Sequence, residues 1–352
     1  MWRASVRDLF CTGQVRRVRG TIFVICLVSL AAFLRGSAPG PALAEEITTI
    51  RLATLLPPGS PYNDLLRAWN RSLKKNTDNK VQIRFYTGGS QGDERDFIRK
   101  MRVGQMDAAI LSTTGLGILV RPTLVLAVPG IVENYDQLAR VRETLDGRFT
   151  GLFERSGFQL LVWADAGKIR ILSAHEFATP SDLKSLRPWA WKDEPIFAHF
   201  LKVIGANPVR LGLNEVYAGL QTRMIDTVPV SAIAAIALQW FTKLKYVAKQ
   251  NFGIIVGAIL IKNEKYDALT PEQQQALRAS AVKMIQAYQP MIRRDDDRAY
   301  GSLLKRGFIE VDLNAHQAAW DAVAATTRDE LVGRVYSKSL LEAVEAAASR
   351  TK

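Results

Sequence analysis

Residues 47–111 alternate between strand-like and helix-like patterns, and this alternation limits the possible folds more than any other feature of the chain. Short or alternating apolar runs mark the strand-like segments, and apolar stripes at helical spacing mark the helix-like ones. The expected strands are 47–55, 81–85 and 106–111, and the expected helices are 62–76 and 93–104. This order indicates an α/β fold with a mainly parallel sheet joined by crossover helices.

The rest of the chain continues with mixed helix and strand patterns. Thr270 to Gln273 form a capping box with proline at the first helical position, so a long helix is expected from there to about residue 306, kinked at Pro290. Two amphipathic helices are expected to close the chain. The other expected helices are 134–155, 180–185, 193–204, 216–220 and 232–242, and the other expected strands are 158–164, 168–172, 209–211, 225–230, 253–261 and a short one ending at Val311.

The first 44 residues have the pattern of an export leader. Arginines precede the apolar run 21–34, which has the length of a signal-peptide core and is short for a membrane span. Ala42-Leu43-Ala44 matches a cleavage site. The sequence therefore predicts a signal peptide over 1–44 and a periplasmic protein that begins at Glu45. An uncleaved anchor helix is the alternative.

Cysteine usage and charge exclude several classes of function. Both cysteines, Cys11 and Cys26, lie in the leader, so the remaining chain has no disulfide, thiolate metal site or cysteine nucleophile. The whole chain has 47 basic and 34 acidic residues, and removal of six arginines and one aspartate with the leader leaves 41 against 33, or +8. These charges are spread over predicted helix faces, so we expect no nucleic-acid partner.

Residues 179–231 carry the densest set of local signals. Thr179 is expected to cap a short helical turn that has Pro180 at its first position. Trp189 and Trp191 alternate in an extended segment, so both rings should point to one face. Gly205 is a natural end for the helix that follows.

Many positions of this stretch follow one known pattern at its spacing. The chain resembles the substrate-binding proteins of TRAP (tripartite ATP-independent periplasmic) transporters from about residue 47 to about residue 331. The positions that match are Pro180, Asp182, Leu183, Lys184, Leu186, Gly205, Pro208, Val209, Glu215, Val216, Tyr217, Leu220, Gln221 and Asp226, with Gly88, Gly92, Arg95, Gly104 and Asp107 earlier in the chain.

The resemblance implies a two-lobed periplasmic binding protein fold, type II-like, with a hinge and a long helix that spans both lobes. It implies crossings between the lobes near 165–167 and at 253–261. The expected parts are lobe I at 45–165 plus about 254–294, lobe II at 166–253 plus about 295–335, and a C-terminal helix at 336–352.

The resemblance also implies where a ligand binds, and one departure from the pattern is central. The family arginine that pairs with a ligand carboxylate falls on Trp189, and a ligand-contacting asparagine is replaced near Val230. Lys168 and Arg170 lie near a second cleft arginine of the family. The full set of expected ligand-binding residues is Trp189, Trp191, Lys168, Arg170, Arg187, Glu215, Val230, Trp240 and Gln91.

Catalytic and metal-binding patterns are missing from the sequence. His175, His199 and His316 are isolated, and no paired-histidine spacing exists. The run 88–92 lacks the lysine of a phosphate loop. Four residues carry carboxylates that could be paired as acid and base: Asp182, Asp193, Glu215 and Asp226. They are expected to have structural roles instead. We therefore expect no enzyme activity, metal or cofactor.

The predicted function is that of a receptor that captures a small molecule between two lobes and delivers it to a TRAP permease. The expected partners are the permease's small and large membrane subunits, and the resemblance also allows a tetratricopeptide-repeat periplasmic protein. Without the family arginine, the expected ligand is hydrophobic or amphipathic, with any carboxylate reaching Lys168 or Arg170. Two alternatives are an ordinary C4-dicarboxylate or organic-acid receptor that uses one of these bases or Arg187, and a non-transport sensor or scaffold of the same fold.

Overall fold

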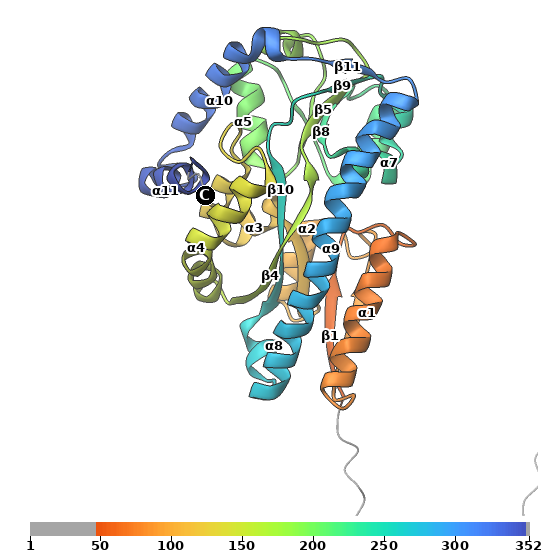
Figure 1. The fold of residues 1–352 in the computed structure, drawn as a ribbon, viewed down its shortest axis with the longest axis vertical. Coiled ribbons are helices and arrows are strands. Elements are labelled where there is room, and N and C mark those ends of the chain that lie inside the picture. The colour runs from red at the N-terminus through yellow and green to blue at the C-terminus, as the bar shows by residue number, and fades with distance from the viewer. Residues whose placement is uncertain (1–46, 350–352) are drawn as a thin grey trace, which may run out of the picture. The chain divides into compact units, whose positions relative to one another are not determined.

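The computed structural model describes residues 47–349, so the predicted leader lies outside the described residues. Figure 1 shows two groups of strands, one above the other, with a long helix beside both. We call the part around the five-stranded sheet lobe I and the part around the four-stranded sheet lobe II. The exact lobe boundaries predicted from the sequence remain a proposal.

The sheet of lobe I contains the strands predicted at the start of the chain. Its order is β2 (Val81–Tyr86), β1 (Thr48–Ala53), β3 (Ala108–Ser112), β10 (Ile254–Lys262) and β4 (Phe158–Lys168). β1 is parallel to β2 and β3, as predicted, but β10 is antiparallel to both β3 and β4. The mainly parallel prediction therefore fails for this half of the sheet, because β10 enters it directly from lobe II and not through a crossover helix.

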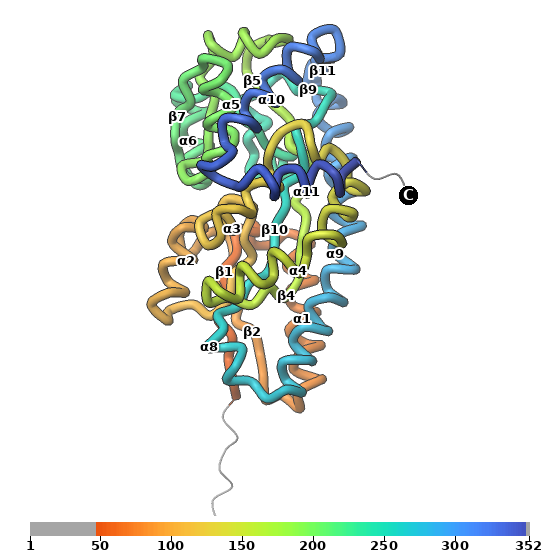
Figure 2. Tube along the Cα trace, turned by 90° about the vertical axis from the view of Figure 1, so that its left-hand side faces the viewer, coloured from red at the N-terminus to blue at the C-terminus, as the bar shows by residue number. Residues whose placement is uncertain are grey.

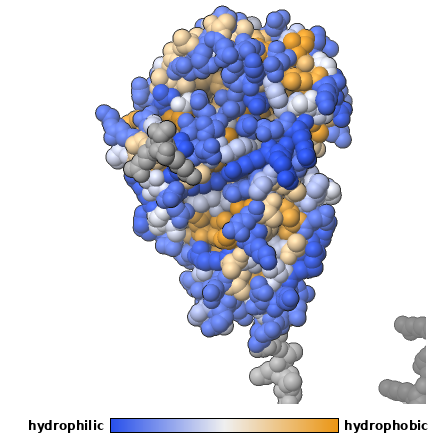
Figure 3. Space-filling model, in the orientation of Figure 1, coloured by the Kyte–Doolittle hydropathy of each residue, from blue (hydrophilic) through white to orange (hydrophobic). Residues whose placement is uncertain are grey.

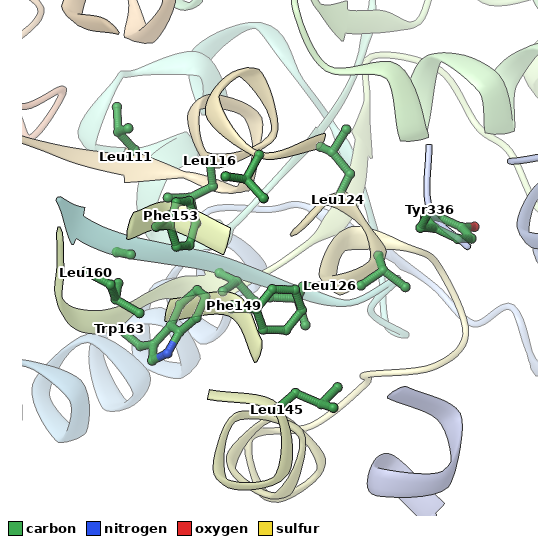
Figure 4. Close-up of a cluster of buried hydrophobic side chains, with 14 of the residues drawn as sticks. Leu111, Leu116, Leu124, Leu126, Leu145, Phe149, Phe153, Leu160, Trp163 and Tyr336 are labelled. Atoms are coloured by element: carbon green, nitrogen blue, oxygen red, sulfur yellow. The ribbon is translucent and has the colours of Figure 1, made fainter. Parts of the chain in front are cut away.

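Helices cover both faces of this sheet, and they pack as their apolar stripes predict. The predicted helices correspond to α1 (Pro61–Asn76), α2 (Glu94–Arg102) and α4 (Tyr135–Arg155), whereas α3 (Thr113–Leu119), the 3₁₀ helix η1 (Arg121–Ala127) and α8 (Asn263–Asp267) were not predicted. Figure 4 shows Phe149 and Phe153 of α4 beside Trp163 of β4, with ring centroids 5.9 and 6.3 Å from the Trp163 ring.

Lobe II contains a smaller sheet and a two-stranded ribbon. The sheet has the order β11 (Ile309–Val311), β9 (Tyr246–Ala248), β5 (Arg170–Ser173) and β8 (Thr227–Val230), and the ribbon pairs β6 (Trp189–Trp191) with β7 (Val209–Leu211). Its other elements are η2 (Pro180–Lys184), α5 (Pro195–Ile204), η3 (Leu213–Glu215), α6 (Val216–Gln221), α7 (Ala232–Ala237) and η4 (Trp240–Lys243). The single helix predicted at 232–242 is thus two pieces, because Gln239 has a positive φ of 59° that interrupts it.

Two strand connections and one long helix join the lobes. β4 leads directly into β5 at residues 168–170, and the chain returns between β9 and β10. α9 (Pro271–Lys305) is a 35-residue helix that continues through Pro290. It packs on α1 and β4 in lobe I and on α7 in lobe II (Figure 1).

The C-terminal helices also contact both lobes. α10 (Gln317–Leu331) packs on α5, and α11 (Lys338–Ser349) packs on α4 and η1 (Figure 2). Figure 3 shows a belt of hydrophilic side chains across the middle of one face, with hydrophobic side chains below it. Among the described residues, no helix combines the length and apolar character that a membrane crossing needs.

Candidate functional site

A cavity lies where the two lobes meet. Its volume of about 330 Å³ is within the usual range of small-ligand pockets. Lobe I contributes the ends of β1 and β3 and the start of α3, and lobe II contributes β6, the start of α5, β8 and α7. The middle of α9, from Met284 to Ile292, closes a further side. Residues far apart in the sequence therefore form one enclosed wall.

The cavity wall is almost entirely apolar. Its charged members are three acidic residues, Glu94, Asp165 and Glu194, and none of the described residues that line it is lysine, arginine or histidine. A ligand in this cavity meets mostly hydrocarbon and aromatic surface. The described part of the wall therefore offers an anionic group no positive side chain to pair with.

The predicted tryptophans form one cluster at this wall. Trp189 and Trp191 both line the cavity, their ring centroids are 6.3 Å apart, and Trp189 is buried. The indole N–H of Trp189 donates to the carbonyl of Leu211 at 3.0 Å. Trp240 lies behind the wall and packs its ring edge-on against Trp189 at 5.4 Å. Val230, also predicted, lines the cavity beside Pro229.

The predicted basic residues are held elsewhere. Lys168 forms an ion pair of 2.7 Å with Asp297, and Arg170 donates to the carbonyl of Lys249 at 2.6 Å. The Arg170 guanidinium also stacks over the Tyr300 ring at 4.3 Å. Neither base is among the residues that line the cavity.

Three further predicted residues also lie outside the cavity wall. Arg187 pairs with Asp226, whose carboxylate also accepts the Arg187 backbone N–H at 2.8 Å. Glu215 accepts the backbone N–H of Gly212 at 2.7 Å. The Gln91 side-chain oxygen accepts a hydrogen bond from the Lys100 ammonium group at 2.9 Å. The structure thus brings together the apolar part of the predicted site and not its polar part.

Two carboxyl groups of the wall, the buried Glu94 and the half-buried Glu194, were missed by the sequence analysis. Glu94 accepts the N–H and the hydroxyl of Ser112 at 2.7 and 2.9 Å and the N–H of Gly115 at 2.7 Å. Glu194 accepts the N–H groups of Ile196 and Phe197 and so caps α5. Burial raises the pKa of Glu94 to about 7 and also raises the pKa of Glu194, because desolvation disfavours the charged form. Their spacing in the sequence resembles ordinary helix starts, so no pattern marks them as cavity residues.

The third acidic residue of the wall anchors the hinge. Asp165, near the end of β4, lies 2.6 Å from Arg142 of α4 and 2.6 Å from Arg293 of α9. Nearby, the Asp296 carboxylate accepts the backbone N–H groups of Lys168 at 2.9 Å and Ile233 at 3.1 Å. Charged groups of α9 therefore hold the strand crossing in place.

Three other titratable residues that the sequence analysis considered, Asp182, Asp193 and His199, have structural partners. Asp182 caps its short helical turn, and Asp193 pairs with Arg95. His199 lies 2.8 Å from Glu330. Within residues 47–349, no group of three or more histidine, cysteine, aspartate or glutamate side chains could hold a metal ion.

Known proteins are similar to this chain in sequence and in fold over most of its length. The model of the bacterial extracellular solute-binding proteins, family 7, matches residues 52–332. The 2,3-diketo-L-gulonate-binding periplasmic protein of Escherichia coli is 25% identical over 94% of this chain and 99% of its own length. The C4-dicarboxylate-binding periplasmic protein of Rhodobacter capsulatus is 23% identical over 94% of this chain and 98% of its own.

Solved structures agree on the fold. A TRAP periplasmic solute-binding protein from Ralstonia eutropha, with bound (S)-2-acetolactate, is 18% identical with a TM-score of 0.80 over 86% of this chain and 99% of that one. One from Sulfitobacter, with bound β-D-galacturonate, is 17% identical with a TM-score of 0.79 over 85% of this chain and 100% of that one. The family match covers most of the chain, and this chain therefore belongs to family 7 of the bacterial extracellular solute-binding proteins, the receptors of TRAP transporters.

Proposed function

We propose that this receptor captures a hydrophobic or amphipathic small molecule between its lobes and delivers it to the small and large membrane subunits of a TRAP permease. The observation that carries the proposal is the cavity wall, whose described residues include acids but no base. The protein itself does no chemistry, and ion coupling belongs to the permease. A tetratricopeptide-repeat partner stays a prediction of the sequence resemblance.

The missing base has a large energetic consequence for acidic ligands. A carboxylate buried without a charged hydrogen-bond partner costs several kcal/mol, on the order of a thousandfold in affinity. Arginine satisfies both carboxylate oxygens at once, whereas Trp189 offers one N–H, which already donates to Leu211. The relatives are named for a diketo sugar acid and C4-dicarboxylates, and two neighbours hold acetolactate and galacturonate. We propose that this receptor does not bind small, strongly acidic ligands of that class.

The wall supplies a different source of affinity. Each CH₂ group moved from water into it contributes roughly 0.8 kcal/mol. The Trp189 and Trp191 rings offer flat apolar faces to an alkyl chain or an aromatic ring. A longer-chain or aromatic acid would need its carboxylate to lie outside the cavity, because Lys168 and Arg170 are paired with other groups.

Calorimetry with two ligand panels tests the proposal. One panel contains short dicarboxylates and sugar acids, and the other contains fatty and aromatic acids with their neutral alcohol and amide counterparts. We expect binding only in the second panel, with affinity lost in Trp189→Ala and kept in Lys168→Ala. Tight binding of a C4-dicarboxylate that is lost in Lys168→Ala but kept in Trp189→Ala would restore the ordinary organic-acid receptor.

We also propose that the protein reaches the periplasm through cleavage after Ala44. The support is the family match together with the leader pattern. The mass of the exported protein should correspond to a chain that begins at Glu45. An exported protein that retains residues 1–44 would contradict this proposal.

A further inference from the structure

Asp93, the residue before α2 in lobe I, makes hydrogen bonds to both lobes. One carboxylate oxygen accepts the backbone N–H of Glu94 at 2.7 Å and so caps the helix. The other oxygen accepts the indole N–H of Trp191 at 2.8 Å and the backbone N–H of Leu213 at 3.1 Å. Trp191 and Leu213 belong to lobe II, so a single side chain connects the two lobes.

Other contacts around Asp93 also require the lobes to be together. Arg95, two positions along the chain, pairs with Asp193 of lobe II. Gly89, in the turn before α2, lies close to the side chain of Asn214, such that an added Cβ would be 3.0 Å from its Nδ2 atom. Opening the hinge would break every one of these contacts. The Asp93–Trp191 bond is partly buried, whereas the Arg95 side chain is 63% exposed, so the Asp93 bond is better shielded from water than the Arg95 pair.

The two lobe II partners of Asp93 have one property in common. Trp191 and Leu213 both line the cavity, whereas Asp93 does not. The carboxylate therefore holds two pieces of the ligand-facing wall without touching a ligand itself. Because the bond to Trp191 uses the only N–H of the ring, it also fixes the side on which that ring lies.

We infer that Asp93 is a positioning residue for ligand capture: it holds the lobes closed and orients Trp191 at the cavity wall. This inference rests on the proposed function and adds the group that sets the rate of ligand release. A hydrogen bond to a charged group is among the stronger ones in proteins, so loss of the Asp93–Trp191 bond should shift the closed-to-open ratio about tenfold toward open.

The experiment uses spin labels, because the chain after residue 44 contains no cysteine. Val103 of lobe I and Met224 of lobe II are 63% and 53% exposed, so labels at Val103→Cys and Met224→Cys report the distance between the lobes. Trp191→Phe removes the indole N–H and keeps an aromatic ring. Asp93→Ser keeps a side chain that can cap α2 but is too short to bridge the lobes. Trp163→Phe is the matched control, since its indole N–H donates to the Asp146 carboxylate within lobe I and its ring does not line the cavity.

The expected result is a shift of the electron–electron distance distribution to longer distances in both Trp191→Phe and Asp93→Ser, and none in Trp163→Phe. The release rate of the neutral apolar dye N-phenyl-1-naphthylamine should rise about tenfold in the first two variants. Unchanged distances in Trp191→Phe would overturn the inference, even if Asp93→Ser failed to fold. If the dye does not bind the unmodified receptor, the apolar-ligand proposal fails, and the distances still decide the role of Asp93.

Discussion

The Asp165 carboxylate of β4 lies 2.6 Å from the Arg293 guanidinium of α9, at the point where the strand leaves lobe I. The Asp165 side chain is fully buried, and Arg142 approaches it from α4, also at 2.6 Å. The buried Asp165 carboxylate, paired with α4 and α9, fixes the strand that leads into lobe II. The hinge therefore has a rigid base on the lobe I side.

Replacing Asp165 should destabilise the protein strongly. Asp165→Asn leaves two arginines without their counter-charge, and breaking a buried ion pair in this way costs about 3–5 kcal/mol. Asp297→Asn is the matched control, because Asp297 is 58% exposed and its pair with Lys168 should contribute less than about 1 kcal/mol. Urea denaturation of the chain after residue 44 measures the free energy of unfolding of both variants. Equal losses of stability would contradict the role given to Asp165.

Gly167 is expected to tolerate no side chain at the crossing. Its φ is +100°, and an added Cβ would lie 2.7 Å from the Ser231 Cβ and 2.9 Å from the Asp296 carboxyl group. Gly167→Ala should therefore lower the free energy of unfolding by about 2 kcal/mol or more. Gly301→Ala, within α9 and with open space around it, should raise stability by about 0.5–1 kcal/mol. Thermal unfolding that ranks the two variants the other way would disprove this account of the crossing.

Glu94 should make stability depend on pH in a definite direction. Burial raises the pKa of Glu94 from 4.5 to about 7, so the folded state keeps a proton that the unfolded state loses in this range. The contribution of Glu94 to stability is therefore complete below about pH 4.5 and is lost as the pH rises through about 7. The total change from this one group is on the order of 3 kcal/mol.

Glu94→Gln separates this effect from other groups with raised pKa values, such as Glu194 and Asp296. The free energy of unfolding of the variant should fall less than that of the unmodified protein as pH rises through this window. Chemical denaturation at several pH values gives the comparison. Parallel pH profiles for the two proteins would show that Glu94 is not the titrating group.

The sequence predicted the tryptophan wall because its cause is local. Trp189 and Trp191 are separated by one residue in a short strand, and alternation in a strand places such residues on one face. Gly205 ends α5 with a φ of 87°, as its position after the apolar stripe predicts. Thr270 caps α9 through its bond to Gln273, as the capping box predicts. Features of this kind need only the spacing of neighbouring residues.

The polar half of the site could not be predicted, since it depends on contacts between distant segments. The charged residues were expected on helix faces, yet Asp296 of α9 is 2% exposed and accepts two backbone N–H groups of other elements. Lys168 was expected at the cleft, but its ammonium group forms an ion pair with Asp297 of α9. Glu94 has the position of an ordinary first-turn acid, and only the approach of β3 and α3 shows that it is buried.

Mass spectrometry of the ligand that co-purifies with the chain after residue 44 tests the central claim most directly. A cavity with no basic residue among its described lining should retain a molecule with a large hydrocarbon or aromatic part, released on denaturation. Trp189→Ala should reduce the bound fraction. A C4-dicarboxylate or a sugar acid in stoichiometric amount would contradict the claim that this receptor has exchanged the charged anchor of its family for an apolar wall.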